Sequence, residues 1–209
     1  MEEREIEIVL EGSPEPHKLL EGLAHHLELP LRSLGMSTTY DRMVDTPDMA
    51  LLAIDHSLRA RQKLGNVYSG NEIRLTYKRP LQEHDVLFIR DEFKLKLTEP
   101  DYGSVLQFLG SLTESLVNQR METILEISEL AREAYLGSEQ NLLNVSIDEC
   151  SYSRPDAEGQ AGEFVLELES HGVSDELLLS AADWVLQHYE GRVAAEGKYA
   201  RGLRLLGQL

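Results

Sequence analysis

The chain has 209 residues, of which 42% are hydrophobic and 27% are charged, so it is long enough to bury a sizeable core. We predict one domain over residues 1–209. No apolar run approaches the roughly 18 residues that a membrane-spanning helix needs, which argues against a membrane protein. A single cysteine, Cys150, excludes an internal disulfide framework, and the acidic N-terminus is unlike a signal peptide. These features predict a cytoplasmic protein.

The charge is strongly acidic and unevenly distributed. The chain carries 20 Lys and Arg against 37 Asp and Glu, a net charge of −17, which argues against non-specific nucleic-acid binding. Residues 59–96 carry a net charge of +4, whereas residues 97–190 carry −16. On charge alone, a solvated charged face is the simpler interpretation of the cationic stretch, and a local site for an anionic ligand is the alternative.

Alternation with a period of two predicts strands, and helical spacing of apolar residues predicts helices. In chain order, the predicted elements are a strand over 3–10, a helix over 17–29, strands over 58–61, 72–78 and 90–97, a helix over 102–116, strands over 122–127, 145–149 and 163–169, and helices over 174–189 and 194–206. Ser174 is the predicted N-cap of its helix. Breaks are predicted at 65–70, 79–85, 137–141 and 154–162.

The predicted strands each have one apolar face and one charged face. An antiparallel sheet with one face in water would satisfy this pattern. A barrel with charges in its lumen, and with helices over its apolar outer surface, would satisfy it equally. The carboxylates gather on the first and the late strands, whereas the cations gather on the middle strands. This segregation favours the barrel.

A series of short motifs runs along the chain in a characteristic order. They are Glu5-Ile-Glu7, Asp45-Thr-Pro-Asp48, Leu58-Arg-Ala-Arg61, Leu75-Thr-Tyr-Lys78, Arg90-Asp-Glu92-Phe93, Arg120, Asp148, Glu167-Leu-Glu169 and Lys198-Tyr-Ala-Arg-Gly202. In this order and spacing, the sequence resembles the CYTH superfamily, also called triphosphate tunnel metalloenzymes, over most of its length. That superfamily includes inorganic triphosphatases, thiamine triphosphatases and class IV adenylate cyclases. The resemblance implies an α+β fold, with an eight-stranded antiparallel β-barrel tunnel covered by helices.

The resemblance also implies a set of site residues. The expected substrate-binding cations are Arg59, Arg61, Lys78, Arg90 and Arg120, with Arg74 added because it shares their strand face. Lys198 is expected beside the reacting phosphate, and Lys198 and Arg59 are the expected catalytic residues. The expected ligands of Mg²⁺ or Mn²⁺ are Glu5, Glu7, Asp148, Glu167 and Glu169. These residue types suit the chemistry, since arginine makes forked contacts to phosphate and hard divalent cations prefer oxygen ligands.

The other charged residues of these segments are expected to have structural roles or to be exposed to solvent. Glu92 is expected to orient arginines and Arg201 to pair structurally. We expect Glu3 and Glu163 to be solvated or at the rim. Lys94 and Lys96 are expected in solvent, and Lys63 and Arg79 in loops. Cys150 is expected to be a small strand residue.

The chain departs from the superfamily pattern at two places. The opening signature of the superfamily is Glu-x-Glu-x-Lys, and Val9 stands at its lysine position. Met43 and Val44 stand where relatives often have tyrosines, so a mechanism that needs such a tyrosine is not expected here.

Metal-dependent hydrolysis of inorganic triphosphate or of a small organic triphosphate is the predicted function. A non-catalytic module that binds polyphosphate or nucleotide is the alternative, motivated by Val9 and Met43. A class IV adenylate cyclase is the third hypothesis. The expected partner is a small-molecule triphosphate, and neither a nucleic acid nor a membrane is expected as a partner. The sequence leaves open whether the protein forms a homodimer.

Overall fold

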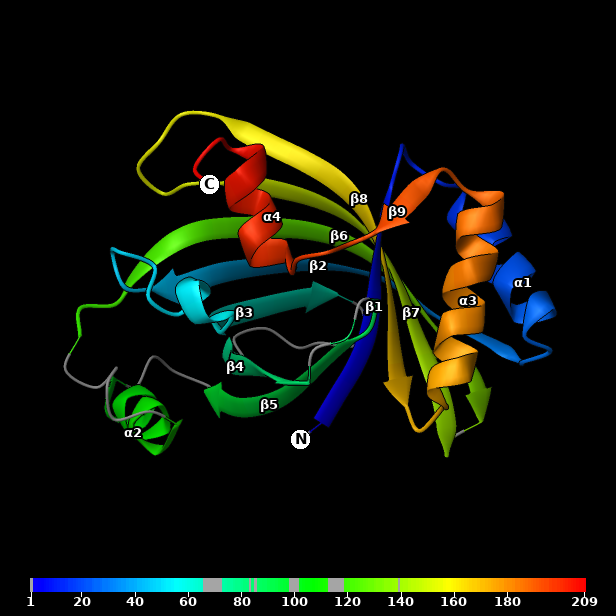
Figure 1. Ribbon diagram of the computed structural model, residues 1–209, viewed down its shortest axis with the longest axis horizontal. Helices are drawn as coiled ribbons and strands as arrows, with labels where there is room; N and C mark the ends of the chain where they lie inside the picture. Colours follow the sequence, from blue (N-terminus) through cyan, green and yellow to red (C-terminus); the bar gives the residue numbers. More distant parts are fainter. Residues whose placement is uncertain are drawn as a thin grey trace.

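The chain forms a closed antiparallel β-barrel of eight strands with helices packed against it (Figure 1). The computed structural model describes residues 2–65, 73–82, 84, 86–97, 102–112, 119–138 and 140–209. The strand order is β5-β4-β3-β2-β6-β7-β8-β1, and pairing between β1 and β5 closes the circle. A short strand, β9, pairs with β1 in addition. The predicted α+β barrel is therefore confirmed.

The barrel strands are β1 (Glu2–Leu10), β2 (Leu31–Asp45), β3 (Ser57–Gly65), β4 (Ile73–Gln82), β5 (Phe88–Leu97), β6 (Glu122–Ser138), β7 (Asn141–Ser153) and β8 (Gln160–His171). The short strand β9 covers Gly191–Val193. The helices are α1 (Pro16–His26), the 3₁₀ turn η1 (Leu52–Ile54), α2 (Tyr102–Leu112), α3 (Asp175–His188) and α4 (Lys198–Leu205). None of these described helices is long and apolar enough to cross a membrane.

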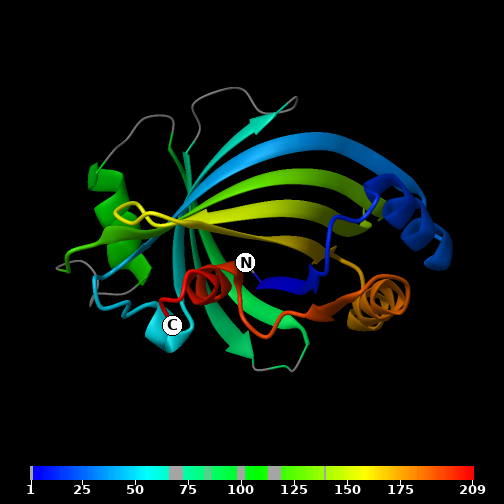
Figure 2. The same ribbon diagram turned by 90° about the horizontal axis from the view of Figure 1, so that it is seen from above.

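Strand alternation separates a charged lumen from an apolar outer surface. On β1, Glu5 and Glu7 line the internal cavity, whereas Ile6 and Ile8 are fully buried on the other face. Ile6 and Ile8 pack in one cluster with Leu19 of α1 and with other residues of α1 and α3. Figure 2 shows α1 and α3 together on one side of the barrel and α2 on the opposite side.

Strand β2 is absent from the sequence-based prediction, although it spans 15 residues. Its lumen side carries the polar residues Thr39 and Asp41, and its outer side carries Tyr40 and Arg42, which are exposed. Because these two outer residues are exposed, the strand needs no apolar stripe there. With polar residues on both faces, the alternation that predicts a strand disappears.

Helix α4 packs on the inner face of the barrel. Its Tyr199 and Leu203 join an apolar cluster with Met43 of β2, Tyr152 of β7 and Val165 of β8. Gly202 permits this approach, since a Cβ atom there would lie 2.5 Å from the Tyr152 ring. The cluster closes off the lumen beside the charged cavity.

The Asp45-Thr-Pro-Asp48 motif forms a structural turn. The Asp45 carboxylate is fully buried and accepts hydrogen bonds from the backbone N–H groups of Thr46, Leu51 and Leu52, at 2.7–3.0 Å. It also accepts from the Tyr199 hydroxyl at 3.2 Å. One side chain thus joins the end of β2, the η1 turn and α4.

We expect Asp45→Ala to lower the free energy of unfolding by about 3 kcal/mol, because it leaves several buried donors without an acceptor. Urea unfolding followed by circular dichroism measures this loss. Asp48→Ala is the matched control, because Asp48 is exposed in the same turn. Its expected effect is within about 0.5 kcal/mol. Equal losses in the two variants would show that the Asp45 contacts are not what holds this turn.

Candidate active site

The barrel encloses a cavity of about 470 Å³ lined mostly by charged side chains. The lining lysines and arginines are Arg59, Arg61, Lys63, Arg74, Lys78, Arg90, Lys94 and Lys198. The lining carboxylates are Glu3, Glu5, Glu7, Asp41, Asp55, Glu92, Glu129, Glu133, Asp148, Glu167 and Glu169. Eight cations therefore face eleven carboxylates, and the cavity has a formal charge of −3 when all of them are ionised.

The two arginines of β3 differ in how firmly the protein holds them. Arg61 makes a forked contact to Asp41 at 2.7 and 2.5 Å and a third contact to Glu129 at 2.7 Å. Arg59 reaches Asp41 only at 3.5 Å, and its buried Nε has no hydrogen-bond partner. The Arg59 guanidinium is consequently the more available of the two for a ligand in the cavity.

The carboxylates of β1 are held by cations from distant parts of the chain. Glu5 pairs with Arg90 at 2.7 Å and with Lys78 at 3.7 Å. Glu7 pairs with Arg201 of α4 at 2.5 Å. Arg201 also donates to Glu163 at 2.9 Å, so the expectation of a structural pairing role for Arg201 is confirmed.

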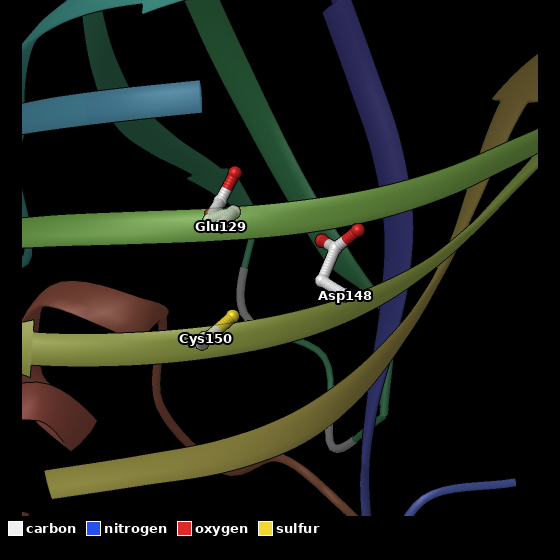
Figure 3. A group of neighbouring side chains, drawn as sticks. All are labelled: Glu129, Asp148 and Cys150. Carbon is white, nitrogen blue, oxygen red and sulfur yellow. The ribbon is translucent and has the colours of Figure 1, made fainter. Parts of the chain in front are cut away.

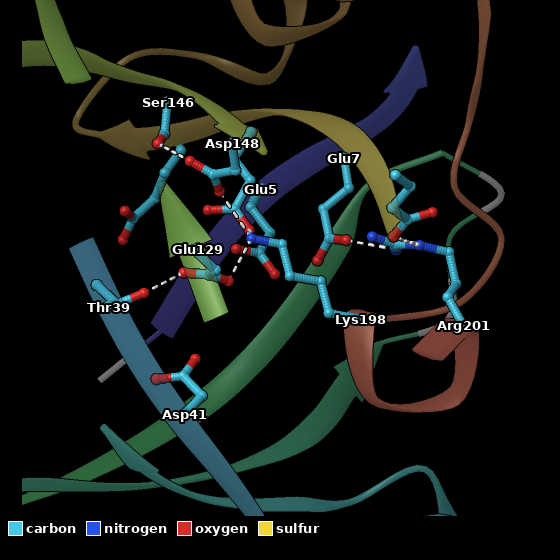
Figure 4. A network of polar contacts seen from close by, with 12 residues as sticks. Glu5, Glu7, Thr39, Asp41, Glu129, Ser146, Asp148, Lys198 and Arg201 are labelled. Carbon is cyan, nitrogen blue, oxygen red and sulfur yellow. Dashed lines mark hydrogen bonds and ion pairs between the residues drawn. The ribbon is translucent and has the colours of Figure 1, made fainter. Parts of the chain in front are cut away.

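Lys198 lies at the centre of the network in Figure 4. Its ammonium contacts Glu129 of β6 at 2.8 Å, Asp148 of β7 at 2.7 Å and Glu167 of β8 at 2.9 Å. The Oε2 atom of Glu129 accepts hydrogen bonds from Thr39 at 2.6 Å and from Arg61 at 2.7 Å. A residue of α4 is thus tied to three neighbouring strands.

The donor set of the cavity suits a divalent cation. The five predicted ligands, Glu5, Glu7, Asp148, Glu167 and Glu169, all line this one cavity and offer carboxylate oxygens, which Mg²⁺ and Mn²⁺ prefer. Figure 3 shows a further grouping, in which ligand atoms of Glu129, Asp148 and Cys150 all lie within 4.8 Å of one another. The acidic residues present therefore fit a metal ion.

Burial and ion pairing shift the pKa values of these carboxyl groups in opposite directions. Burial raises the pKa of Glu5 to about 7, aided by Glu3 and opposed by Lys78 and Arg90. Burial also raises the pKa of Asp148 to about 7 against the effect of Lys198. Burial acts in the same direction on Glu129, but Arg61 and Lys198 outweigh it and hold the pKa of Glu129 below its ordinary value.

The raised pKa values predict how the stability of the metal-free protein depends on pH. In the unfolded chain, Glu5 and Asp148 lose their protons near their ordinary values of 4.5 and 3.8, whereas in the folded protein they keep them until about pH 7. The unfolded state therefore binds fewer protons between these limits. We expect the free energy of unfolding to fall between pH 5.5 and 7.5, by up to about 1.4 kcal/mol per pH unit for each group.

Urea unfolding in a chelator at both pH values measures this slope. Glu5→Gln is expected to reduce it, because the amide does not titrate. A metal-free protein that becomes more stable from pH 5.5 to 7.5 would contradict the assignment of these two groups.

Most of the predicted site residues meet in the cavity, and one does not. Arg120 lies outside the lining, with a side chain that is 80% exposed and paired to Glu122 at 2.9 Å. It precedes β6, which begins at Glu122. Val9 is also outside the described lining. It lies opposite Val165, a member of the apolar cluster beneath α4.

Several residues that were assigned to solvent, the rim or loops are buried or line the cavity instead. Lys63 belongs to β3 and pairs with Glu133. Lys94 also borders the cavity and pairs with Glu92, but its side chain is exposed, as expected. Glu3 is buried and contacts Lys78 at 2.7 Å, and the buried side chain of Glu163 contacts Arg201. The expectations for Lys63, Glu3 and Glu163 were wrong, because a lumen face and a solvated face produce the same alternation in sequence.

Sequence reasoning missed several polar residues of the cavity, among them Thr39, Asp41, Glu129 and Glu133. The predicted strand over 122–127 took Glu122 and Glu126 as its charged face. In the structure, β6 continues to Ser138, and its lumen side runs through Ile127, Glu129, Ala131 and Glu133. The two glutamates share a face with Leu125 and Ile127, which the prediction took as apolar, so the alternation did not reveal them.

Comparisons with known proteins agree with this arrangement. The model of a CYTH domain matches residues 3–202. Similar solved structures include PH1819 from Pyrococcus horikoshii, with 18% identity, a TM-score of 0.60 and coverage of 96% of this chain and 98% of that one. HpAC1 from Hippeastrum has 16% identity, a TM-score of 0.61 and coverage of 99% and 97%. A search of curated proteins finds no match.

Proposed function

Because the chain belongs to the family of proteins with a CYTH domain, and because its cavity sets cations against carboxylates, we propose that it is a metal-dependent triphosphatase. The proposed substrate is inorganic triphosphate or a small organic triphosphate, and the proposed metal is Mg²⁺ or Mn²⁺. The observation that carries the proposal is the composition of the enclosed cavity, in which eight lysines and arginines and eleven carboxylates meet.

The charge of the cavity explains why a metal is needed. A triphosphate carries about four negative charges near neutrality, and the cavity itself has a formal charge of −3. When all of these carboxylates are ionised, repulsion opposes binding of the substrate to the metal-free cavity. Divalent cations on the carboxylates would reverse the sign of the cavity, as two of them bring the formal charge to +1.

Named residues fall into distinct roles in this proposal. Glu5, Glu7, Asp148, Glu167 and Glu169 would hold the metal. A bound divalent cation supplies charge neutralisation at the reacting phosphate and orients the attacking water. Arg59, Lys78 and Arg90 face the cavity and would bind the phosphate chain, with Arg59 the least committed to protein partners. Fixed cations of this kind stabilise the charge that shifts onto oxygen as the P–O bond breaks.

Two further facts support hydrolysis over the alternatives. HpAC1, which shares the fold, is described as having a dominant triphosphatase activity although it carries an adenylyl cyclase name. Val9, which motivates a non-catalytic module, lies outside the described lining of the cavity, so its lack of charge removes no cation from the lining. The lone buried Cys150 supports a reducing, cytoplasmic location for this activity.

Product analysis tests the proposal. The protein is incubated with inorganic triphosphate, thiamine triphosphate or ATP, each with Mg²⁺ or Mn²⁺, and the products are separated by ion-exchange chromatography. Orthophosphate supports a triphosphatase, and its yield ranks the substrates. Cyclic nucleotide with pyrophosphate would replace the proposal by a cyclase, and binding without any product would replace it by a binding module.

A further inference from the structure

The Lys198 ammonium makes an arrangement that is unusual for a lysine that faces a ligand cavity. Its nitrogen lies 2.7–2.9 Å from carboxylate oxygens of Glu129, Asp148 and Glu167, so all three of its N–H donors have anionic partners. The side chain is only 9% exposed. A compact positive charge inside three carboxylates occupies the kind of position that a metal ion would take.

Two of these three partners, Asp148 and Glu167, belong to the carboxylates proposed above to hold the metal. Glu5 and Glu7 are held by different cations, Arg90 and Arg201. The ammonium of Lys198 therefore contacts two of the proposed metal ligands at once. A divalent cation bound to these oxygens and an ammonium bound to them would repel each other at short range.

We propose that Lys198 is a tethered competitor of the metal: its ammonium fills the carboxylate cluster of Glu129, Asp148 and Glu167 in the metal-free protein, and metal binding displaces it. This inference rests on the proposed function in that the cavity takes a divalent cation. The displaced ammonium then remains in the cavity as a donor for the phosphate chain. Metal entry thereby converts a charge that neutralises the protein into one that binds substrate.

The structure allows the displacement without movement of α4. Tyr199 is anchored to Asp45, and Arg201 is anchored to Glu163, so the helix is fixed by contacts that involve neither Lys198 nor a proposed metal ligand. The lysine side chain has a flexible four-carbon stem, which lets its ammonium move while its Cα stays in place.

Mn²⁺ binding measured by isothermal titration calorimetry, in the absence of any triphosphate, tests the proposal. We expect Lys198→Met to bind Mn²⁺ at least tenfold more tightly than the wild type, because the competing charge is gone. Lys198→Arg keeps the charge and is expected to stay within threefold of the wild type. Lys18→Met, which removes an exposed lysine of α1, controls for the change in net charge. Unchanged or weaker Mn²⁺ binding by Lys198→Met would overturn the proposal, as would equal tightening by Lys18→Met.

A second measurement covers the chance that Lys198→Met fails to fold without metal, since it leaves buried carboxylates without a cation. Thermal unfolding is then followed over a series of Mn²⁺ concentrations. We expect Mn²⁺ to raise the midpoint of Lys198→Met by more than that of the wild type, and to restore folding where it is lost. Failure of Mn²⁺ to do either would overturn the inference. Tighter Mn²⁺ binding together with no turnover of triphosphate in the wild type would uphold it and refute the proposed function.

Discussion

Glu5→Gln is expected to lower the kcat of metal-dependent turnover roughly a thousandfold while leaving the protein folded. Glu5 lines the cavity and is one of the proposed metal ligands. Burial raises the pKa of its carboxyl group to about 7, so the metal-free protein already tolerates a neutral group there. Glutamine has the same shape and can accept from Arg90, which Glu5 contacts at 2.7 Å. Loss of activity would then reflect the loss of a ligand charge.

Phosphate release measures the activity, and urea unfolding in a chelator at pH 7.5 measures the stability. Glu2→Gln is the matched control, because Glu2 lies on the same strand with an exposed side chain paired to Arg4. It is expected to keep wild-type activity. If Glu5→Gln retained turnover within a few-fold of the wild type, Glu5 would not be a metal ligand.

Arg59→Ala is expected to raise the KM for triphosphate by about a hundredfold, with a small effect on stability, because forked arginine contacts to phosphate are strong and charge-assisted. Arg59 lines the cavity, touches Asp41 only at 3.5 Å and has a buried Nε without a hydrogen-bond partner. Its removal therefore costs the folded protein little. Steady-state kinetics at saturating Mn²⁺ measures the change.

Two comparisons make this prediction specific. Arg42→Ala on the outer face of β2 removes an exposed arginine and is expected to leave KM unchanged. Arg61→Ala is expected to lower the free energy of unfolding by about 3–5 kcal/mol, since it leaves the buried Asp41 and Glu129 without their shared cation. If Arg59→Ala destabilised the protein as much as Arg61→Ala does and left KM unchanged, Arg59 would be a structural residue and not a substrate-binding one.

The sequence predicts the barrel well where one strand face is buried under a helix. Ile6 and Ile8 alternate with Glu5 and Glu7 because α1 and α3 cover one side of β1 and the cavity lies on the other. The prediction fails at β2, where Tyr40 and Arg42 are exposed and the lumen side, with Thr39 and Asp41, is polar too. Local pattern cannot reveal a strand whose two faces have the same polarity.

The candidate site, too, could be predicted from the sequence only in part. Apart from Arg120, the predicted site residues all line the cavity, but many other residues line it too. Pairing, however, depends on which strands become neighbours, and sequence spacing does not contain that information. Lys198 meets Glu129 and Asp148 across 69 and 50 residues of chain. Arg120 shows the opposite failure, because it matches a motif and yet lies before β6 enters the barrel.

Orthophosphate release from inorganic triphosphate by the wild-type protein, with Mg²⁺, with Mn²⁺ and with a chelator, tests the central claim most directly. Purified Glu5→Gln and Arg59→Ala serve as blanks for contaminating phosphatase. The account predicts release with at least one of the two metals, none with the chelator, and a strong reduction in both variants at low triphosphate concentration. Release that persists in the chelator or equally in both variants, or no release with either metal, would contradict it.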